Sequence, residues 1–145
     1  MQKIERTIVI EGGDPQAIWD YVSDFTTTEE WDPPTQTTER LSGDGGVGTV
    51  YRNVSKFLGS ETEVTYTVVA HEPPHRLELD GETSSVKLHD EITVEQEGTD
   101  VRVHYRAEFH PHGVAKLAEP VLPLALKKIG DDAAEQLELC LRKLG

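Results

Sequence analysis

Asp90 is the residue whose chemical type fits least with its place in the sequence. Residues 85–95 alternate as a β-strand does, and Asp90 shares the apolar side of that strand with Leu88. A carboxylate on a buried face has a raised pKa, so an inward Asp90 could act as an acid or base, or bind a ligand hydroxyl. A bulge or register shift would instead turn Asp90 to solvent, beside Lys87 or His89.

Three further side chains could work with Asp90. Tyr66 and Tyr105 fall at inward positions of their strands, where their hydroxyls could orient a ligand, although buried tyrosines more often bond to backbone or water. Arg52 is a conditional catalytic candidate. Both parities of residues 49–57 mix apolar and polar side chains, so either Arg52 or Asn53 could face inward.

Other kinds of chemistry find little support in the sequence. His110 and His112 form an H-x-H pair, but they lie in a Pro-Gly turn without a nearby cysteine or an obvious third ligand, so we expect no metal. Cys140 has no intrachain partner, in agreement with a reducing compartment. The glycine-rich residues 43–48 lead into a strand rather than a helix, so they are no dinucleotide fingerprint and we expect no cofactor.

One long helix is expected to close the chain. From about Pro120 onward, apolar residues recur every three or four positions, at Leu122, Leu126, Ile129, Ala133, Leu137, Cys140 and Leu144. No other long helical pattern exists, so this stripe must pack on a sheet. Pro120 and Pro123 predict either a break that leaves an entrance at one end, or simply the first turn of the helix.

The elements before this helix are mostly strands. Residues 3–11 read as a strand, Pro15–Ser23 as a helix capped by Asp14, and Thr28–Trp31 as a second short helix. Six further strands follow, with short turns between them, at residues 35–41, 49–57, 61–71, 76–80, 85–95 and 100–109. We therefore expect a single α+β domain over residues 1–145, in which a curved antiparallel sheet of about seven strands wraps around the C-terminal helix.

Composition narrows the function. The chain has 145 residues with 14 Lys and Arg against 27 Asp and Glu, a formal net charge of -13. Such a charge repels phosphate backbones, so we expect no nucleic-acid partner. No apolar run reaches the roughly 20 residues needed to cross a bilayer, and the N-terminus lacks the layout of a secretion signal. We therefore expect a cytoplasmic protein without membrane insertion.

Four local sequences resemble one superfamily. They are DPQAIWDYVSDFTTTEEWDPP, GGVGTVYR, VVAHEPPHRLEL and GTDVRVHYRAEF, and together they cover nearly the whole chain. In this order, followed by the terminal helix, they resemble the START-like helix-grip (SRPBCC) superfamily, which includes polyketide cyclase and dehydrase proteins, coenzyme Q-binding proteins and Bet v 1-like pollen allergens. The resemblance implies the fold and an internal cavity, but members of the superfamily catalyse, carry or merely bind.

The expected cavity is lined mainly by aliphatic and aromatic residues. By strand parity and the helix stripe, its ligand-binding residues are Val64, Tyr66, Val68, Leu88, Asp90, Tyr105, Phe109, Leu122 and Leu126, with Trp31 either closing one end or contacting the ligand. Such a lining favours a hydrophobic or aromatic guest that is polyketide-, lipid- or quinone-like. Leu124 and Leu139 lie off the stripe and could contact a lid loop or a second subunit in a homodimer.

Two alternatives remain open. The first is an enzyme similar to the aromatase/cyclases, which tend to place polar side chains, including an arginine, on the cavity side of the fourth strand. Here Val64, Tyr66 and Val68 occupy that stretch, so Arg52 and Asp90 would have to substitute. The second is a toxin-like protein-interaction module, for which the net charge makes contact with ribosomal RNA unfavourable.

Overall fold

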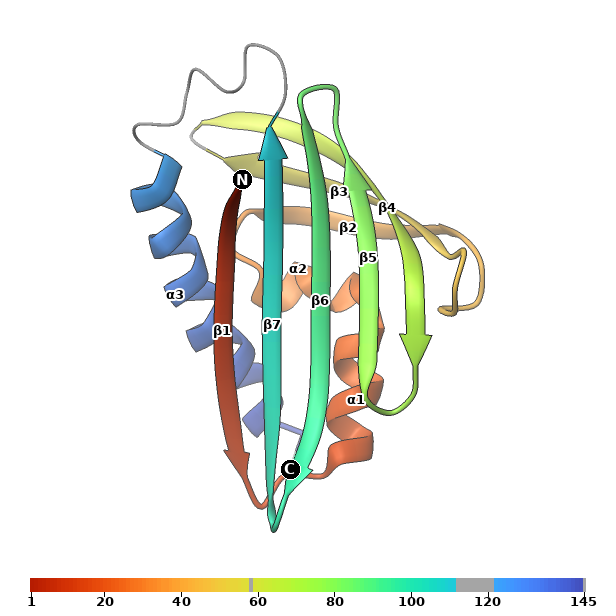
Figure 1. The fold of residues 1–145 in the computed structure, drawn as a ribbon, viewed down its shortest axis with the longest axis vertical. Helices are drawn as coiled ribbons and strands as arrows, with labels where there is room; N and C mark the ends of the chain where they lie inside the picture. The colour runs from red at the N-terminus through yellow and green to blue at the C-terminus, as the bar shows by residue number, and fades with distance from the viewer. Residues whose placement is uncertain (58, 112–121, 145) are drawn as a thin grey trace.

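A computed structural model describes residues 1–57, 59–111 and 122–144. One antiparallel sheet contains all seven strands in the order β1-β7-β6-β5-β4-β3-β2, and three helices lie on one side of it (Figure 1). The strands are β1 (Gln2–Glu11), β2 (Thr35–Ser42), β3 (Val50–Phe57), β4 (Ser60–Glu72), β5 (Arg76–Glu82), β6 (Val86–Glu97) and β7 (Asp100–Pro111). The helices are α1 (Pro15–Ser23), α2 (Thr28–Trp31) and α3 (Leu122–Arg142), with a 3₁₀ turn at Phe25–Thr27. The predicted helix-grip fold is confirmed.

The first two helices begin and end where their sequence dictates. Oδ1 of Asp14 accepts a hydrogen bond from the backbone N–H of Gln16 at 3.0 Å, and Pro15 supplies the first helical residue of α1. Helix α2 ends at Trp31, because Asp32 is already extended and prolines follow it. The chain therefore turns sharply and enters β2 directly under α2.

The apolar stripe of α3 faces the concave side of the sheet. Leu126, Ala133, Leu137 and Cys140 are buried as predicted, and Leu141 joins them. Leu144 is 40% exposed instead, because the helix ends before it at Arg142. Leu124 and Leu139 are exposed, as their positions off the stripe predict. Pro120 and residues 113–119 lie outside the described residues, so the predicted break there stays a prediction.

Two apolar clusters make up the core. The larger joins α1, α2 and the C-terminal half of α3 to the inner face of the sheet. The smaller consists of Ile4, Ala107 and Leu126, with Phe109 and Ile129 packed against it. Tyr105 packs against both clusters, so it lies where the two halves of the core meet.

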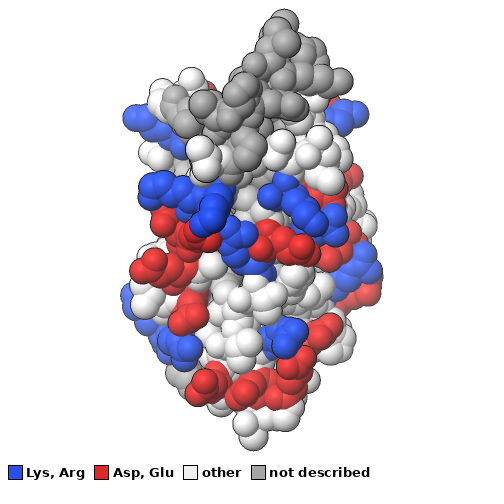
Figure 2. Space-filling view, turned by 60° about the vertical axis from the view of Figure 1, so that its left-hand side comes forward, with Lys and Arg blue, Asp and Glu red and all other residues white. Residues whose placement is uncertain are grey.

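The surface mixes both signs of charge despite the acidic net charge. On the face shown in Figure 2, basic and acidic side chains lie next to one another. Arg6 pairs with Asp131 at 2.9 Å, and Lys127 pairs with the same carboxylate at 2.9 Å. Among the described residues, no helix is both long and apolar enough to cross a membrane.

Candidate functional site

Asp90 faces the interior of the protein. β6 pairs with β5 and with β7 without a bulge, so the alternation of its side chains continues through Asp90. Asp90 lies between Leu79 of β5 and Ala107 of β7, and only 3% of it is exposed. The alternative in which a bulge turns this carboxyl to solvent is therefore wrong.

The carboxyl of Asp90 is only half satisfied. The hydroxyl of Tyr105 donates a hydrogen bond to Oδ2 at 3.2 Å, whereas Oδ1 is buried and accepts none from any described residue. Burial and the nearby carboxylate of Asp32 raise the pKa of Asp90 to about 7, and the bond from Tyr105 offsets only part of this. A buried acceptor without a donor is costly and typical of a binding or catalytic position.

Asp32 is a second carboxyl at the same site. It follows directly after α2, is half-buried, and its Oδ2 accepts a hydrogen bond from the Thr35 hydroxyl at 2.6 Å. Burial raises the pKa of Asp32 to about 6, although the bond from Thr35 counteracts this. Since the charge of Asp32 disfavours ionisation of Asp90, a proton or a cation would stabilise the site.

The ring of Tyr66, on β4, packs over Gly81 of β5, where a residue with a Cβ atom would not fit. Tyr66 pairs with Gly81, and a Cβ atom on Gly81 would lie 2.6 Å from Cε1 of the Tyr66 ring. Burial, followed by the charges of Asp90 and Asp32, raises the pKa of the Tyr66 hydroxyl well above its usual value. Gly81 thus lets the ring of Tyr66 lie flat over the sheet near both carboxyls.

Trp31 connects these polar groups to the helices. Its ring meets that of Tyr105 edge to face, with 5.3 Å between centroids. Its indole N–H donates to the hydroxyl of Thr27 at 3.3 Å, and the residue is 2% exposed. Trp31 therefore belongs to the core and also contacts the partner of Asp90.

Burial of the inner face changes along the sheet. Near the β6–β7 turn, inward residues such as Ile92, Val94 and Val103 are fully buried. Tyr105, directly opposite Ile92, is only partly buried, and so are Leu88 and Phe109 towards the other end of these strands, although all three face inward. We call the region formed by Tyr66, Leu88, Asp90, Tyr105, Phe109 and Leu126 the concave recess.

The third strand turns Asn53 inward and Arg52 outward. Asn53 is 3% exposed, whereas Arg52 is exposed and its guanidinium lies 3.7 Å from Glu39. Asn53 is inward because Tyr51, of the same parity, packs against Phe25 in the core. The condition under which Arg52 is a catalytic candidate is therefore not met.

A buried polar network links Asn53 to Asp32. The side-chain amide of Asn53 donates to the hydroxyls of Thr35 at 3.0 Å and Thr38 at 2.9 Å. Thr35 in turn donates to Asp32, and the hydroxyls of Thr28 and Thr38 lie 2.7 Å apart. This network fixes the end of α2, and with it the side chain of Asp32.

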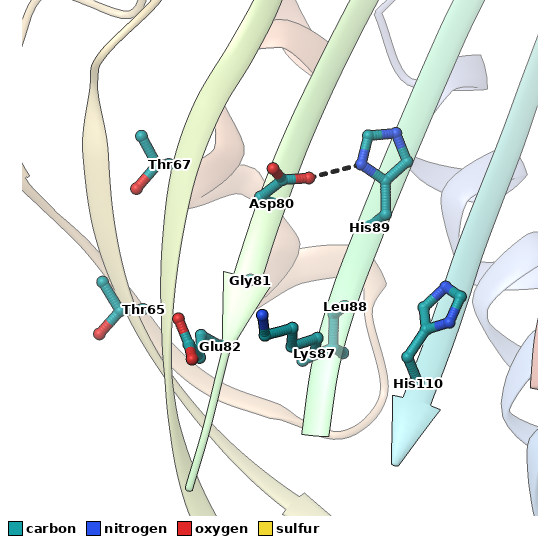
Figure 3. Close-up of a pocket in the computed structure, with 9 residues that line it drawn as sticks. All are labelled: Thr65, Thr67, Asp80, Gly81, Glu82, Lys87, Leu88, His89 and His110. Carbon is teal, nitrogen blue, oxygen red and sulfur yellow. Dashed lines mark hydrogen bonds and ion pairs between the residues drawn. The ribbon is translucent and has the colours of Figure 1, made fainter. Parts of the chain in front are cut away.

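Two hollows formed by described residues lie mainly outside the concave recess, although Leu88 of that recess also lines the first. The larger, about 520 Å³, is on the outer face of the sheet over β4, β5 and β6 (Figure 3). Its lining includes Thr65, Asp80, Glu82, Lys87 and His89, so it is polar and charged. It is therefore not the apolar cavity that the sequence predicts, which stays a prediction.

Two carboxylates hold the ring of His89 in this outer hollow. Its Nδ1 lies 2.6 Å from Asp80 Oδ1 (Figure 3), and its Nε2 lies 2.8 Å from Glu78 Oε1. Burial alone would lower the pKa of His89, but these two carboxylates raise it above its usual value. His110 bonds to Glu108, and His112 lies outside the described residues. In the part of the chain that the structure describes, no three potential ligands form a metal site.

The second hollow is a cleft of about 440 Å³ between α2 and α3. We call it the α2–α3 cleft; it is lined by Glu29, Glu30, Trp31, Asp32, Pro33, Thr35, Asp132, Glu135 and Gln136. Trp31 and Asp32 belong both to this cleft and to the surroundings of Asp90. The cleft therefore adjoins the site from the helical side.

The structure brings most of the predicted site residues together. Tyr66, Asp90 and Tyr105 cluster, Leu88 pairs with Phe109, and Leu126 packs near Phe109. Val64 and Val68 lie deeper in the core, and the side chain of Leu122 lies outside the described residues. Sequence analysis missed Asp32 and Gly81 as site residues. The available signal for Asp32 was a threonine three residues further on, a spacing at which Asp and Thr side chains commonly bond.

Comparisons with solved structures support the fold alone. A START superfamily protein from Mycobacterium smegmatis superposes with a TM-score of 0.80 at 13% identity, covering 99% of both chains. The Zhui aromatase/cyclase from Streptomyces sp. R1128 gives 0.76 at 13% identity, covering 98% of this chain and 94% of that one. Ara h 8.0201 gives 0.58 at 16% identity, covering 92% of this chain and 98% of that one.

Comparison with protein families is more specific. No curated protein matches the sequence. The family described as polyketide cyclase/dehydrase and lipid transport matches residues 1–140, almost the whole chain. The protein therefore belongs to the polyketide cyclase/dehydrase and lipid transport family.

Proposed function

We propose that the protein binds an apolar or aromatic small molecule in the concave recess, as a carrier or binding protein. The observation that carries this proposal is the buried Oδ1 of Asp90, which has no donor among the described residues and lies on the otherwise apolar inner side of β6. Apolar sites with few polar groups are typical of ligand pockets, where the polar groups fix orientation. A guest that donates a hydrogen bond to Oδ1 would complete the site.

The partly buried residues support the same location. Leu88, Tyr105 and Phe109 face the interior and yet remain accessible, so a guest could cover apolar surface there. Each 100 Å² of apolar surface removed from water contributes about 2.5 kcal/mol. The outer hollow lies on the opposite face of the sheet, and charged side chains such as Asp80, Glu82 and Lys87 line it.

Thermal shift against polyketides, fatty acids, quinones and sterols tests the proposal. A ligand at 100 times its dissociation constant stabilises the native state by about 2.7 kcal/mol, which for a domain of this size raises the melting temperature by roughly 5 to 10 °C. Phe109→Ala should reduce the shift, whereas Lys87→Ala, in the outer hollow, should leave it unchanged. If Lys87→Ala alone abolishes the shift, the ligand binds on the outer face and the proposal is wrong.

One observation favours an enzyme as a second candidate. A pKa of about 7 makes Asp90 suited to both accept and donate a proton near neutral pH. An aromatic polyketide analogue that is cyclised or dehydrated by the wild type and not by Asp90→Asn would support catalysis. Binding without turnover would favour the carrier.

A further inference from the structure

We propose that the molecule bound in the concave recess is an apolar amine, whose ammonium group binds to Asp90 and Asp32. This inference rests on the proposed function, since it names the chemical class of the guest at the same site. It follows from the presence of two carboxyls at this site, one of which, Asp90, has a buried oxygen without a donor among the described residues.

Each of the two carboxyls accepts one side-chain hydrogen bond from a described residue. Oδ1 of Asp90 accepts no hydrogen bond from a described residue, and Asp32 accepts one from Thr35 through Oδ2. Asp32 lies close enough for its charge to raise the pKa of Asp90. An ammonium group has up to three N–H donors and a positive charge, so it satisfies both oxygens and removes their repulsion.

The protein's own cations near Asp90 are already engaged. Arg6, which pairs with Tyr105 across β1 and β7, directs its guanidinium to Asp131 at 2.9 Å and to the carbonyl of Lys127 at 3.2 Å. His89 neighbours Asp90 in sequence but lies on the outer face between two carboxylates. From β7, the hydroxyl of Tyr105 donates to Asp90, and from β4 the hydroxyl of Tyr66 lies near enough for the charge of Asp90 to raise its pKa.

Three aromatic residues lie near the carboxyl of Asp90. Trp31 packs on Tyr105, which bonds to Asp90, and the charges of both carboxyls act on Tyr66. Aromatic rings attract cations through their negative faces, most strongly where water is excluded. Aromatic rings beside carboxylates therefore favour an ammonium group over a neutral donor of the same size.

The cleft that adjoins the site also favours cations. The α2–α3 cleft is lined by Glu29, Glu30, Asp32, Asp132 and Glu135, and its lining contains no lysine or arginine. Carboxylates that line a cleft raise the local concentration of cations. Asp32 lines this cleft and also acts on Asp90, so an amine attracted to the cleft arrives next to the recess.

Calorimetric titration with a matched pair of probes tests the inference. The probes are 2-(1-naphthyl)ethylamine, which is protonated at pH 7, and the neutral 2-(1-naphthyl)ethanol, which has the same apolar body. We expect the amine to bind at least tenfold more tightly. Because a cation lowers the pKa of Asp90 from about 7, amine binding at pH 7 should also release part of a proton, measured by repeating the titration in buffers of different ionisation enthalpy.

Two variants and a control complete the test. Asp90→Asn should reduce the affinity for the amine to that for the alcohol and abolish proton release. Asp32→Asn should lower the affinity for the amine but not that for the alcohol. Asp20→Asn, exposed on α1, should change neither affinity. Melting curves verify that each variant folds. Equal affinity of the wild type for amine and alcohol overturns the ammonium proposal and leaves the proposed function standing. If the wild type binds neither probe, and the broader ligand panel also fails, the proposed function is overturned.

Discussion

The hydroxyl of Tyr105 donates a hydrogen bond to Oδ2 of Asp90 over 3.2 Å, where the other inward residues of β6 are apolar. The pair lies where the two apolar clusters of the core meet. A buried carboxyl with a single described donor makes stability depend on its protonation state, so this contact yields predictions that need no knowledge of the ligand.

Replacing Asp90 with Asn should remove part of the pH dependence of stability. Burial, with Asp32 nearby, raises the pKa of Asp90 to about 7 from 3.8, so the folded state binds the proton more tightly than the unfolded state. The stabilisation is complete below about pH 4 and is lost as the pH rises through 7, on the order of 4 kcal/mol for the full shift. Urea unfolding between pH 5 and pH 8 measures it.

Asp20→Asn is the control for Asp90→Asn. Asp90→Asn should lose less stability than the wild type over this range, while Asp20→Asn keeps the wild-type slope. Parallel curves for all three proteins would show that Asp90 ionises as freely in the folded state as in the unfolded one.

Tyr105→Phe should destabilise the protein more at high pH than at low pH. The substitution removes the described donor to Asp90, whose pKa should then rise further because this bond lowers it. We expect a loss of about 1 to 3 kcal/mol at pH 8, where the carboxyl must otherwise ionise without a partner. Urea unfolding measures the loss, and Asp90→Asn provides the second arm of a double-mutant cycle. A cost that does not change with pH would contradict the pairing.

Gly81→Ala should disturb the ring of Tyr66. The added Cβ would lie 2.6 Å from Cε1 of that ring, which cannot move away easily because it is buried. Inserting a methyl group into a packed core costs about 1 to 3 kcal/mol. Gly46→Ala is the control, because its Cβ would meet the end of the Asp44 side chain at 3.3 Å and Nδ1 of His71 at 4.0 Å, and neither contact is a clash. Equal melting temperatures for the two variants would refute the close contact.

The fold could be predicted from the sequence because its signals are local and repeated. The bounds of α1 and α2 followed from Asp14, Pro15 and the prolines after Trp31, and strand alternation together with short turns gave the meander. The apolar stripe on α3 predicted which side of this helix packs against the concave face of the sheet. Each of these signals depends on spacing along the chain, which folding preserves.

The site was harder to predict because its members meet through tertiary contacts. The parity of β3 was ambiguous until Asn53 could be seen bonded to Thr35 and Thr38 of a neighbouring strand. Asp32 joined the site only because the turn after α2 aims it there, and a turn has no periodicity. Gly81 gave no signal, since its role is to leave room for a ring on another strand.

Arg52→Ala should leave ligand binding unchanged. Its side chain is 48% exposed on the outer face and pairs with Glu39 at 3.7 Å, a surface contact worth at most about 1 kcal/mol. Asn53→Ala, one residue further along, should destabilise the protein more than Arg52→Ala does, since it breaks two buried hydrogen bonds. Titration of any ligand found by the thermal shift panel compares the two variants. Loss of binding in Arg52→Ala alone would place the ligand on the outer face.

Thr35→Val tests whether the buried network controls Asp32. Valine keeps the shape of threonine but removes the hydroxyl that donates to Asp32 at 2.6 Å and accepts from Asn53 at 3.0 Å. Since the bond from Thr35 lowers the pKa of Asp32, its loss should move that pKa above about 6, and more of the carboxyl is then protonated at pH 7. We expect a loss of about 1 to 3 kcal/mol in stability. Affinity for the naphthyl amine should fall at pH 7 and recover as the pH rises.

The recovery at high pH separates an electrostatic effect from a structural one. A displaced α2 would weaken amine binding at every pH, whereas a raised pKa weakens it only where Asp32 is protonated. Thr37→Val, exposed on the same strand, should bind as the wild type does throughout. A uniform loss of affinity in Thr35→Val would show that the network positions the helix, and that the charge of Asp32 does not determine which guest binds.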